Sequence, residues 1–128
     1  MSKGNVFISG ASRGIGKSIA NHFAENDYKV IGTSRNDFEF DNKSENLIPI
    51  KLDITSRDDV KQCFNDLKSK DLLPDILINN AGITSDQIFL KMKDDDWDNV
   101  ISTNLTGTYN LTKIFIRNMI KNKNGRII

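Results

Sequence analysis

The stretch that decides the fold is Asn5-Val-Phe-Ile-Ser-Gly-Ala-Ser-Arg-Gly-Ile-Gly16, which leads into a helix-like segment over residues 17–25. An apolar run here breaks into a glycine-rich turn. A buried strand followed by glycines and a helix is the order that phosphate binding needs, because glycine lets the backbone approach the anion and the helix N-terminus presents free N–H groups. The stretch therefore predicts a strand, a phosphate-binding turn and a helix.

The glycine spacing of this turn is unusual. It reads Gly10-x-x-x-Gly14-x-Gly16 and not the G-x-G-x-x-G of common dinucleotide folds. On the turn alone, three glycines capping a helix are an open alternative. The helix is favoured by apolar residues at helical spacing, which give it one face to lay on a sheet. Those residues are Ile15, Ile19, Ala20 and Phe23.

Composition limits the classes of function. The chain has 128 residues, 38% of them apolar and 27% charged, with a net charge of +1, which is typical of a globular domain or part of one. The near-zero net charge disfavours nucleic acid and membrane surfaces as partners. The apolar runs are too short to span a bilayer, and the first residues lack the apolar core of a signal peptide, so we expect a cytoplasmic protein.

Strand and helix patterns alternate along the rest of the chain. Near-continuously apolar strands alternating with helices predict an α/β fold, a Rossmann-type doubly wound parallel sheet with helices on both faces. We expect residues 1–128 to be the N-terminal, cofactor-binding part of one such domain, ending within its fifth strand. The predicted segments after the first helix are strand 29–34, loop or weak helix 36–46, strand 47–52, helix 56–70, strand 76–79, helix 94–122 and strand 126–128.

Local signals sharpen three of these segments. Pro49 cannot donate to a strand ladder and places its strand near an edge or at a strand start. Ser56 followed by Asp59 is close to a capping box and starts the second helix. Gly107 marks a possible bend in the long helix. Polar and small residues gather where the predicted strands end, at Ser9-Gly10, Ser34-Arg35, Asp53-Ile54 and 79–82, and the carboxyl ends of parallel strands meet at one ligand crevice.

These motifs identify a resemblance. Ser9-Gly-Ala-Ser-Arg-Gly-Ile-Gly16, Leu52-Asp53, Asn79-Asn-Ala-Gly82 and the Asn104 of Ser102-Thr-Asn-Leu105 resemble the short-chain dehydrogenase/reductase family. Residues 80–84, 90–93, 97–107 and 125–128 are most similar to the 3-oxoacyl-acyl-carrier-protein reductases of type II fatty acid synthesis. The resemblance covers essentially the whole chain. It implies NADPH-dependent reduction of a 3-oxoacyl thioester on acyl carrier protein, and a homo-oligomer that is commonly a tetramer.

The resemblance also implies the binding residues. The glycine turn would hold the pyrophosphate and adenosine side of the cofactor, Asp53 the adenine amine, and Asn80 and Gly82 the ribose near the nicotinamide. Two alternatives stay open: Asp53 as a strand-end turn residue, and Asn79-Asn80 as a cap of the following loop. The cofactor-binding residues so implied are Gly10, Ser12, Arg13, Gly14, Ile15, Gly16, Arg35, Asp53, Ile54, Asn80, Ala81 and Gly82.

The end of the second predicted strand bears on the choice of cofactor. NAD-selective enzymes place a carboxylate there for the ribose 2′-OH, whereas an Arg accommodates the 2′-phosphate of NADP. This chain has Arg35 there and Arg13 in the turn, with Asp37 close by. We therefore expect NADP(H).

Catalysis in the family uses a tyrosine as proton donor, a lysine, a serine and an asparagine that holds a water. Asn104 fits the asparagine, with a plain helix-bend asparagine as the alternative. The family's serine, tyrosine and lysine follow the fifth strand, beyond Ile128, so we expect the 128 residues alone to be inactive. Tyr109-Asn-Leu-Thr-Lys113 matches the Tyr-x-x-x-Lys pattern, but we interpret it as a chance match within the helix of Asn104.

Other candidate sites have simpler explanations. His22 has no triad partner, Cys63 lies on an apolar helix face, and the acids 94–96 complement a helix dipole, so we expect no metal site. Lys121, Lys123 and Arg126 suit the helix end and would equally suit an acidic acyl carrier protein. The alternatives to the leading function are a related reductase acting on acetoacetyl-CoA, a sugar or another carbonyl or alcohol, and an inert dinucleotide-binding module.

Overall fold

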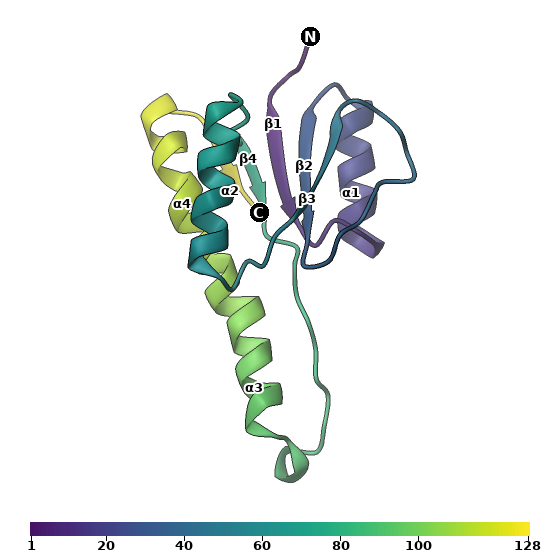
Figure 1. Cartoon of the computed structure of the whole chain (residues 1–128), viewed down its shortest axis with the longest axis vertical. Helices are drawn as coiled ribbons and strands as arrows, with labels where there is room; N and C mark the ends of the chain where they lie inside the picture. The colour runs from purple at the N-terminus through teal and green to yellow at the C-terminus, as the bar shows by residue number, and fades with distance from the viewer.

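The computed structural model describes residues 1–128 and contains one five-stranded parallel sheet in the order β3-β2-β1-β4-β5 (Figure 1). The chain moves from β1 outward to β3 and then returns to the other side of β1 to form β4. This reversal is the switch point of a doubly wound sheet, and the predicted fold class is confirmed. The strands are β1 (Asn5–Ser9), β2 (Lys29–Ser34), β3 (Leu47–Lys51), β4 (Ile76–Ile78) and β5 (Arg126–Ile127).

Helices cover both faces of the sheet. Helix α1 (Gly14–Glu25) lies on one face, and α2 (Arg57–Ser69) and α4 (Gly107–Asn122) lie on the other (Figure 1). Successive residues of β1 point to opposite faces, so Val6 and Ile8 join a core with Ala20 of α1. Phe7 points the other way and meets Phe115 of α4, with ring centroids 4.8 Å apart. The sheet is therefore buried on both sides.

The starts of the first two helices follow from local sequence. α1 begins at Gly14, three residues before the expected start, because the glycine turn runs directly into it. At the start of α2, Ser56 Oγ accepts a hydrogen bond from the Asp59 backbone N–H at 3.2 Å, which confirms the predicted cap. Pro49 lies in β3, which pairs only with β2 at the sheet edge, as predicted. Residues 36–46 form a loop without helix or strand.

A helical arm projects from the sheet. It consists of the short 3₁₀ turn η1 (Phe89–Lys91), α3 (Asp94–Ile101) and the π-helical turn η2 (Ser102–Thr106), which continues directly into α4 (Figure 1). The irregularity expected at Gly107 thus lies in the turn just before it. Gly107 itself packs tightly, since a Cβ there would lie 2.7 Å from Ile54 Cδ1. No helix in the chain has both the length and the apolar character needed to cross a membrane.

Candidate cofactor site

A cleft of about 700 Å³ opens at the carboxyl ends of β1, β2 and β4 and beside the turn after β3. Its walls come from four separate parts of the chain, as expected for the switch point of a doubly wound sheet. Gly16, the remaining residue of the expected binding set, is buried behind the turn. The expected binding residues that line the cleft are Gly10, Ser12, Arg13, Gly14, Ile15, Arg35, Asp53, Ile54, Asn80, Ala81 and Gly82.

Glycine is needed at the three positions of the turn for different structural reasons. Gly10 and Gly14 adopt φ of +69° and +58°, which L side chains rarely adopt. A Cβ on Gly14 would meet nothing within 4 Å, so this backbone faces open space in the cleft. A Cβ on Gly16 would lie 2.0 Å from the Gly10 carbonyl oxygen. Gly16 therefore lets α1 pack against the turn, while Gly14 leaves room for a ligand.

The N-terminus of α1 points its free donors at the cleft. Arg13 is the N-cap residue, and its side chain makes no capping hydrogen bond. The first turn of the helix holds no acidic residue, so nothing within it neutralises the partial positive charge. With Arg13 beside it in the cleft wall, this helix end favours an anion such as a pyrophosphate.

Hydrogen bonds lock the end of β4 to the end of β1. Asn80 Nδ2 donates to the Gly10 carbonyl oxygen at 2.9 Å. Ser9 Oγ accepts from the backbone N–H groups of Asn80 and Ala81 at 3.1 and 3.0 Å. Asn79 turns the other way and donates through Nδ2 to Thr112 Oγ1 of α4 at 3.2 Å. The two asparagines thus brace the turn and the helix, and neither side chain caps the loop that follows.

Asp53 both shapes a turn and faces the cleft. Its Oδ1 accepts hydrogen bonds from the Thr55 N–H at 3.0 Å and from Thr55 Oγ1 at 2.6 Å. The hydrogen bond from the Thr55 hydroxyl is the largest cause that lowers the pKa of Asp53. Partial burial opposes it, and the Thr55 N–H and the charge of Arg35 lower the pKa by smaller amounts, so the pKa lies below its usual value. The turn role considered from sequence is therefore present, and it holds an ionised carboxylate in the cleft wall.

The end of β2 presents a cation. Arg35 and Asp37 both line the cleft, but Asp37 Oδ2 forms an exposed ion pair with Lys51 Nζ at 3.9 Å. No acidic side chain forms an ion pair with Arg35 or Arg13. The Arg35 and Arg13 guanidinium groups are therefore available to an anionic group of a ligand.

Asn104 ties the arm to the loop after β4. Its Nδ2 donates to the Ile83 carbonyl oxygen at 2.9 Å, and its Oδ1 accepts from the Ile83 N–H at 2.8 Å. It lies in the π-helical turn η2, and such turns often occur at functional sites. A Cβ on Gly82 would lie 3.5 Å from Asn104 Oδ1, so Asn104 lies against the loop of the cleft wall.

The cleft also has walls that sequence reasoning did not name. Thr55 follows Asp53 at the spacing of an Asx turn, and this signal could have found it. Thr103 and Ile83 come together only through the Asn104–Ile83 pairing, which no local pattern predicts. The lining residues missed from sequence are Thr33, Asn36, Phe38, Thr55, Ile83 and Thr103, whereas Ser34 and Leu52 were named there together with Arg35 and Asp53.

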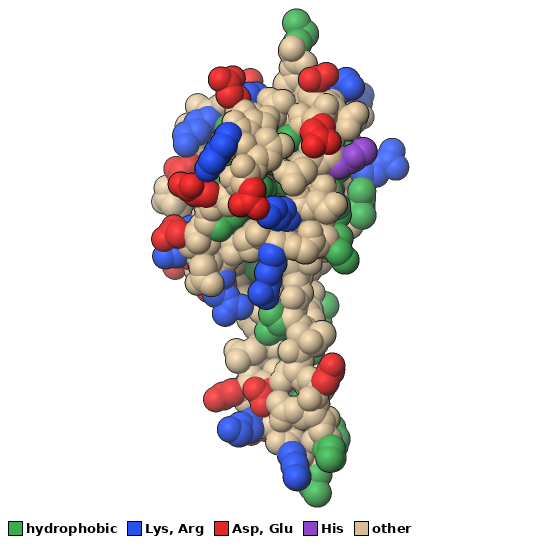
Figure 2. Space-filling view, turned by 90° about the vertical axis from the view of Figure 1, so that its right-hand side faces the viewer, with side chains coloured by type: hydrophobic (Ala, Val, Ile, Leu, Met, Phe, Trp, Pro, Cys, Tyr) green, Lys and Arg blue, Asp and Glu red, His purple; other side chains and the backbone are tan.

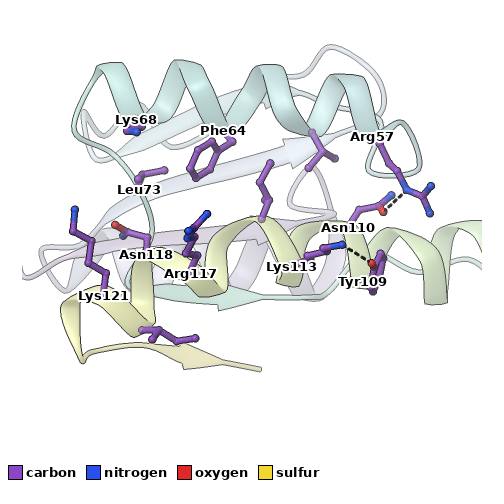
Figure 3. A pocket seen from close by; sticks show the side chains of 13 residues that line it. Arg57, Phe64, Lys68, Leu73, Tyr109, Asn110, Lys113, Arg117, Asn118 and Lys121 are labelled. Carbon is purple, nitrogen blue, oxygen red and sulfur yellow. Dashed lines mark hydrogen bonds between the residues drawn. The ribbon is translucent and has the colours of Figure 1, made fainter.

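A second cavity, of about 1040 Å³, lies between α2 and α4 and away from the cleft (Figure 3). It contains the Tyr-x-x-x-Lys match: Lys113 Nζ lies 3.0 Å from Tyr109 OH, and this contact lowers the pKa of Tyr109. Because the pair does not line the cleft, it cannot serve a ligand bound there. His22 is exposed on α1, and Cys63 is buried in the core with its thiol pKa raised to about 11 by burial.

The cleft residues fit a dinucleotide. The open backbone at Gly14 and the α1 N-terminus suit a pyrophosphate, and Arg13 and Arg35 add positive charge. Asp53 offers an acceptor for an amine on one wall, while Asn80 and Gly82 form the opposite end. The cleft therefore offers the donors, acceptors and space that a dinucleotide needs.

Known proteins resemble this chain in sequence. The 3-oxoacyl-[acyl-carrier-protein] reductase FabG of Vibrio cholerae is 38% identical over 127 residues, covering 96% of this chain and 52% of that protein. FabG of Buchnera aphidicola subsp. Baizongia pistaciae is 43% identical over 126 residues, covering 94% of this chain and 51% of that protein. The chain spans about half the length of these curated relatives.

Solved structures share the fold. A short chain dehydrogenase from Leptospira borgpetersenii with bound NAD+ matches with a TM-score of 0.92 and 30% identity, over 99% of this chain and 50% of that one. ElxO with NADP bound matches with a TM-score of 0.88 and 38% identity, over 99% of this chain and 54% of that one. The family model of the short chain dehydrogenases matches residues 4–128. The sheet order and the glycine turn of this chain agree with that match. The chain belongs to the short chain dehydrogenase family.

Proposed function

We propose that the cleft binds a nicotinamide dinucleotide and that the full-length protein is an oxidoreductase. One observation carries this proposal: the glycine turn, the unneutralised α1 N-terminus and the Asn80–Gly10 brace share one cleft with Arg35 and Asp53. Neighbouring structures with bound NAD+ and NADP support it. When bound, the nicotinamide supplies or accepts the hydride.

The preferred cofactor is NADP(H). Arg35 directly follows β2 and lines the cleft, at the strand end where NADP-selective enzymes place an Arg, and the nearest acid in sequence, Asp37, is paired with Lys51. Arg13 adds a second cation on the same side of the turn. Asp53 then accepts a hydrogen bond from the adenine amine, and Asn80 and Gly82 form the ribose pocket near the nicotinamide.

The substrate is a 3-oxoacyl thioester, which the protein reduces to the 3-hydroxyacyl form in fatty acid synthesis. The support is the similarity to two FabG reductases over nearly the whole chain. A short chain reductase acting on acetoacetyl-CoA, a sugar or another carbonyl or alcohol is the second candidate, because structural neighbours include a 4-hydroxyisoleucine dehydrogenase and a serine dehydrogenase. An inert dinucleotide-binding module is the third.

Asn104 is the one catalytic residue that this chain contributes. Its side chain pairs with Ile83 at the base of the arm, which holds the π-helical turn in a fixed position beside the cleft. We assign to it the positioning of a water in the proton relay. Because the Tyr109–Lys113 pair lies outside the cleft, we expect the 128 residues alone to consume no NADPH.

The basic end of α4 is a docking surface for acyl carrier protein. Lys121 lies in the last turn of α4 and Lys123 caps it. Charge reversal of Lys121 and Lys123 in the full-length protein should raise KM for a carrier-linked substrate and leave KM for a small thioester mimic unchanged. An equal rise for both substrates would contradict this assignment.

The arm supports a homo-oligomer, and the family resemblance suggests a tetramer. Its tip exposes Ile88, Phe89 and Leu90, and its helix exposes Trp97 and Leu105 (Figure 2). Contiguous apolar surface of this kind marks association sites.

The function is tested by turnover of the full-length protein. NADPH oxidation should be fastest with a 3-oxoacyl thioester on acyl carrier protein, slower with acetoacetyl-CoA and absent with a sugar. Faster turnover of a sugar or simple alcohol would favour the second candidate. Tight NADPH binding without turnover of any carbonyl would favour the inert module.

A further inference from the structure

One buried asparagine joins α4 to the wall of the cleft. Asn110 is 6% exposed, and both ends of its amide are used. Nδ2 donates to the Ile54 carbonyl oxygen at 3.0 Å, and Oδ1 accepts from Arg57 Nε at 3.3 Å. Figure 3 shows Arg57 and Asn110 meeting between α2 and α4. The amide therefore links two helices to the segment that follows β3.

The Ile54 carbonyl depends on this bond. Ile54 lies outside every helix and strand, and no backbone N–H donates to its carbonyl oxygen. Ile54 is also buried, so water cannot freely take the place of Asn110. Loss of this hydrogen bond would therefore cost free energy. Its side chain is held from the same direction, because it packs where a Cβ on Gly107 would lie. Helix α4 thus fixes both the carbonyl and the side chain of Ile54.

Ile54 is the middle residue of the turn that presents Asp53. Asp53 and Thr55 flank it, are hydrogen-bonded to one another and line the cleft on the side of Arg35. A rotation of the Ile54 peptide would move the Asp53 carboxylate and the Thr55 hydroxyl together. The position of this wall is therefore set from α4 and not by the turn alone.

We propose that Asn110, oriented by Arg57, is a positioning residue for the adenine end of the cleft, and this inference rests on the proposed dinucleotide binding. Asn110 acts through Ile54 and does not itself line the cleft. Asn110 is hydrogen-bonded to the wall formed by residues 53–55 and makes no hydrogen bond to residues 80–82, which the proposed function assigns to the nicotinamide end. Loss of Asn110 therefore weakens ligands that carry adenine and spares those that lack it.

The test uses the full-length protein and binding, not turnover. Asn110→Leu keeps the branched shape and the number of side-chain heavy atoms and removes both hydrogen bonds. Affinities for NADPH, for 2′-phospho-ADP-ribose and for reduced nicotinamide mononucleotide are measured by calorimetry or ligand fluorescence. We expect the first two to weaken about tenfold, the order set by one lost buried hydrogen bond, and the mononucleotide to bind unchanged. Asn118→Leu is the matched control, because Asn118 lies on the same helix and makes no side-chain hydrogen bond to residues 53–55.

A merely structural role gives a different result. In that case Asn110→Leu lowers Tm while the folded protein binds all three ligands as before, and the inference is overturned. Equal weakening of all three ligands also overturns it, because the effect would not be confined to the adenine end. The proposed function fails separately, through a wild-type protein that binds none of the three.

Arg57→Ala provides the second variant, since Arg57 is exposed and its loss leaves the core intact. We expect a weaker effect of the same kind, about threefold, because the donor to Ile54 remains but loses its orientation. In the double variant Arg57→Ala/Asn110→Leu the loss should equal that of Asn110→Leu alone. Unchanged affinity in Arg57→Ala would show that Arg57 does not orient Asn110. Additive losses of affinity in the double variant would show the same. If Asn110→Leu does not fold, unchanged 2′-phospho-ADP-ribose affinity in Arg57→Ala overturns the whole proposal.

Discussion

The fold and the cleft depend most on glycine at position 16, where there is no room for a Cβ. A Cβ there would lie 2.0 Å from the Gly10 carbonyl oxygen and 2.5 Å from Asn80 Nδ2. Neither neighbour can retreat easily, because Asn80 Nδ2 itself bonds the Gly10 carbonyl oxygen. The turn, the helix and the end of β4 therefore meet at this one position.

We predict that Gly16→Ala destabilises the full-length protein by about 1–3 kcal/mol, the usual cost of overpacking. Urea unfolding measures the change. Gly82→Ala is the control, since its Cβ would make only an ordinary 3.5 Å contact and its φ is not positive. Equal stability of Gly16→Ala and Gly82→Ala would show that α1 does not pack on the turn as described.

Cys63 gives a prediction about pH. Burial raises the pKa of its thiol to about 11. Because the folded state holds the proton more tightly than the unfolded state, the resulting stability is present below about pH 9 and is lost as the pH rises toward 11. Between pH 8 and 10.5 the loss should be about 2 kcal/mol. Urea unfolding of the wild type and of Cys63→Ala measures it, and an identical pH dependence in both would contradict the burial of the thiol.

At the scale of elements, the sequence predicts the regular parts and misses what depends on contacts between them. Alternating apolar segments, the Ser56 cap and Pro49 at the edge strand are local signals, and each is found as predicted. The π-helical turn at residues 102–106 carries no local signal. It coincides with the pairing of Asn104 with Ile83, residues 21 positions apart.

The candidate site follows the same division. The glycine turn and the strand ends could be named from sequence because parallel strands bring their carboxyl ends together whatever the details of packing. Thr103 and Ile83 could not, since the arm must first fold back to the loop after β4. Asn110 was missed for a similar reason: its polar atoms have meaning only once α2 and α4 are side by side.

At the scale of the whole molecule, the arm is the least self-sufficient part of the fold. Leu90 and Leu105 are 92% and 65% exposed, whereas Val6, Phe7 and Ile8 of the central strand β1 are fully buried. An isolated arm of this kind gains stability only by covering this surface. This exposed surface is the part of the arm that the proposed homo-oligomer would cover.

We predict that Leu105→Glu in the full-length protein shifts the assembly toward smaller species in sedimentation experiments while Tm of the dissociated chain is retained. A buried glutamate without a partner would cost too much for the interface to persist. Asn65→Glu is the control, because it adds the same charge at an exposed position of α2. An unchanged sedimentation profile for Leu105→Glu would show that the arm does not form the interface between copies of the chain.

We propose that the cleft selects NADP(H) through Arg35. The decisive measurement is the ratio of kcat/KM for NADPH to kcat/KM for NADH in the full-length protein, for the wild type and for Arg35→Asp. The account predicts a wild-type ratio above one and a fall of at least about tenfold in the variant, since a carboxylate repels the 2′-phosphate and accepts from the 2′-OH. An unchanged ratio in Arg35→Asp would contradict it.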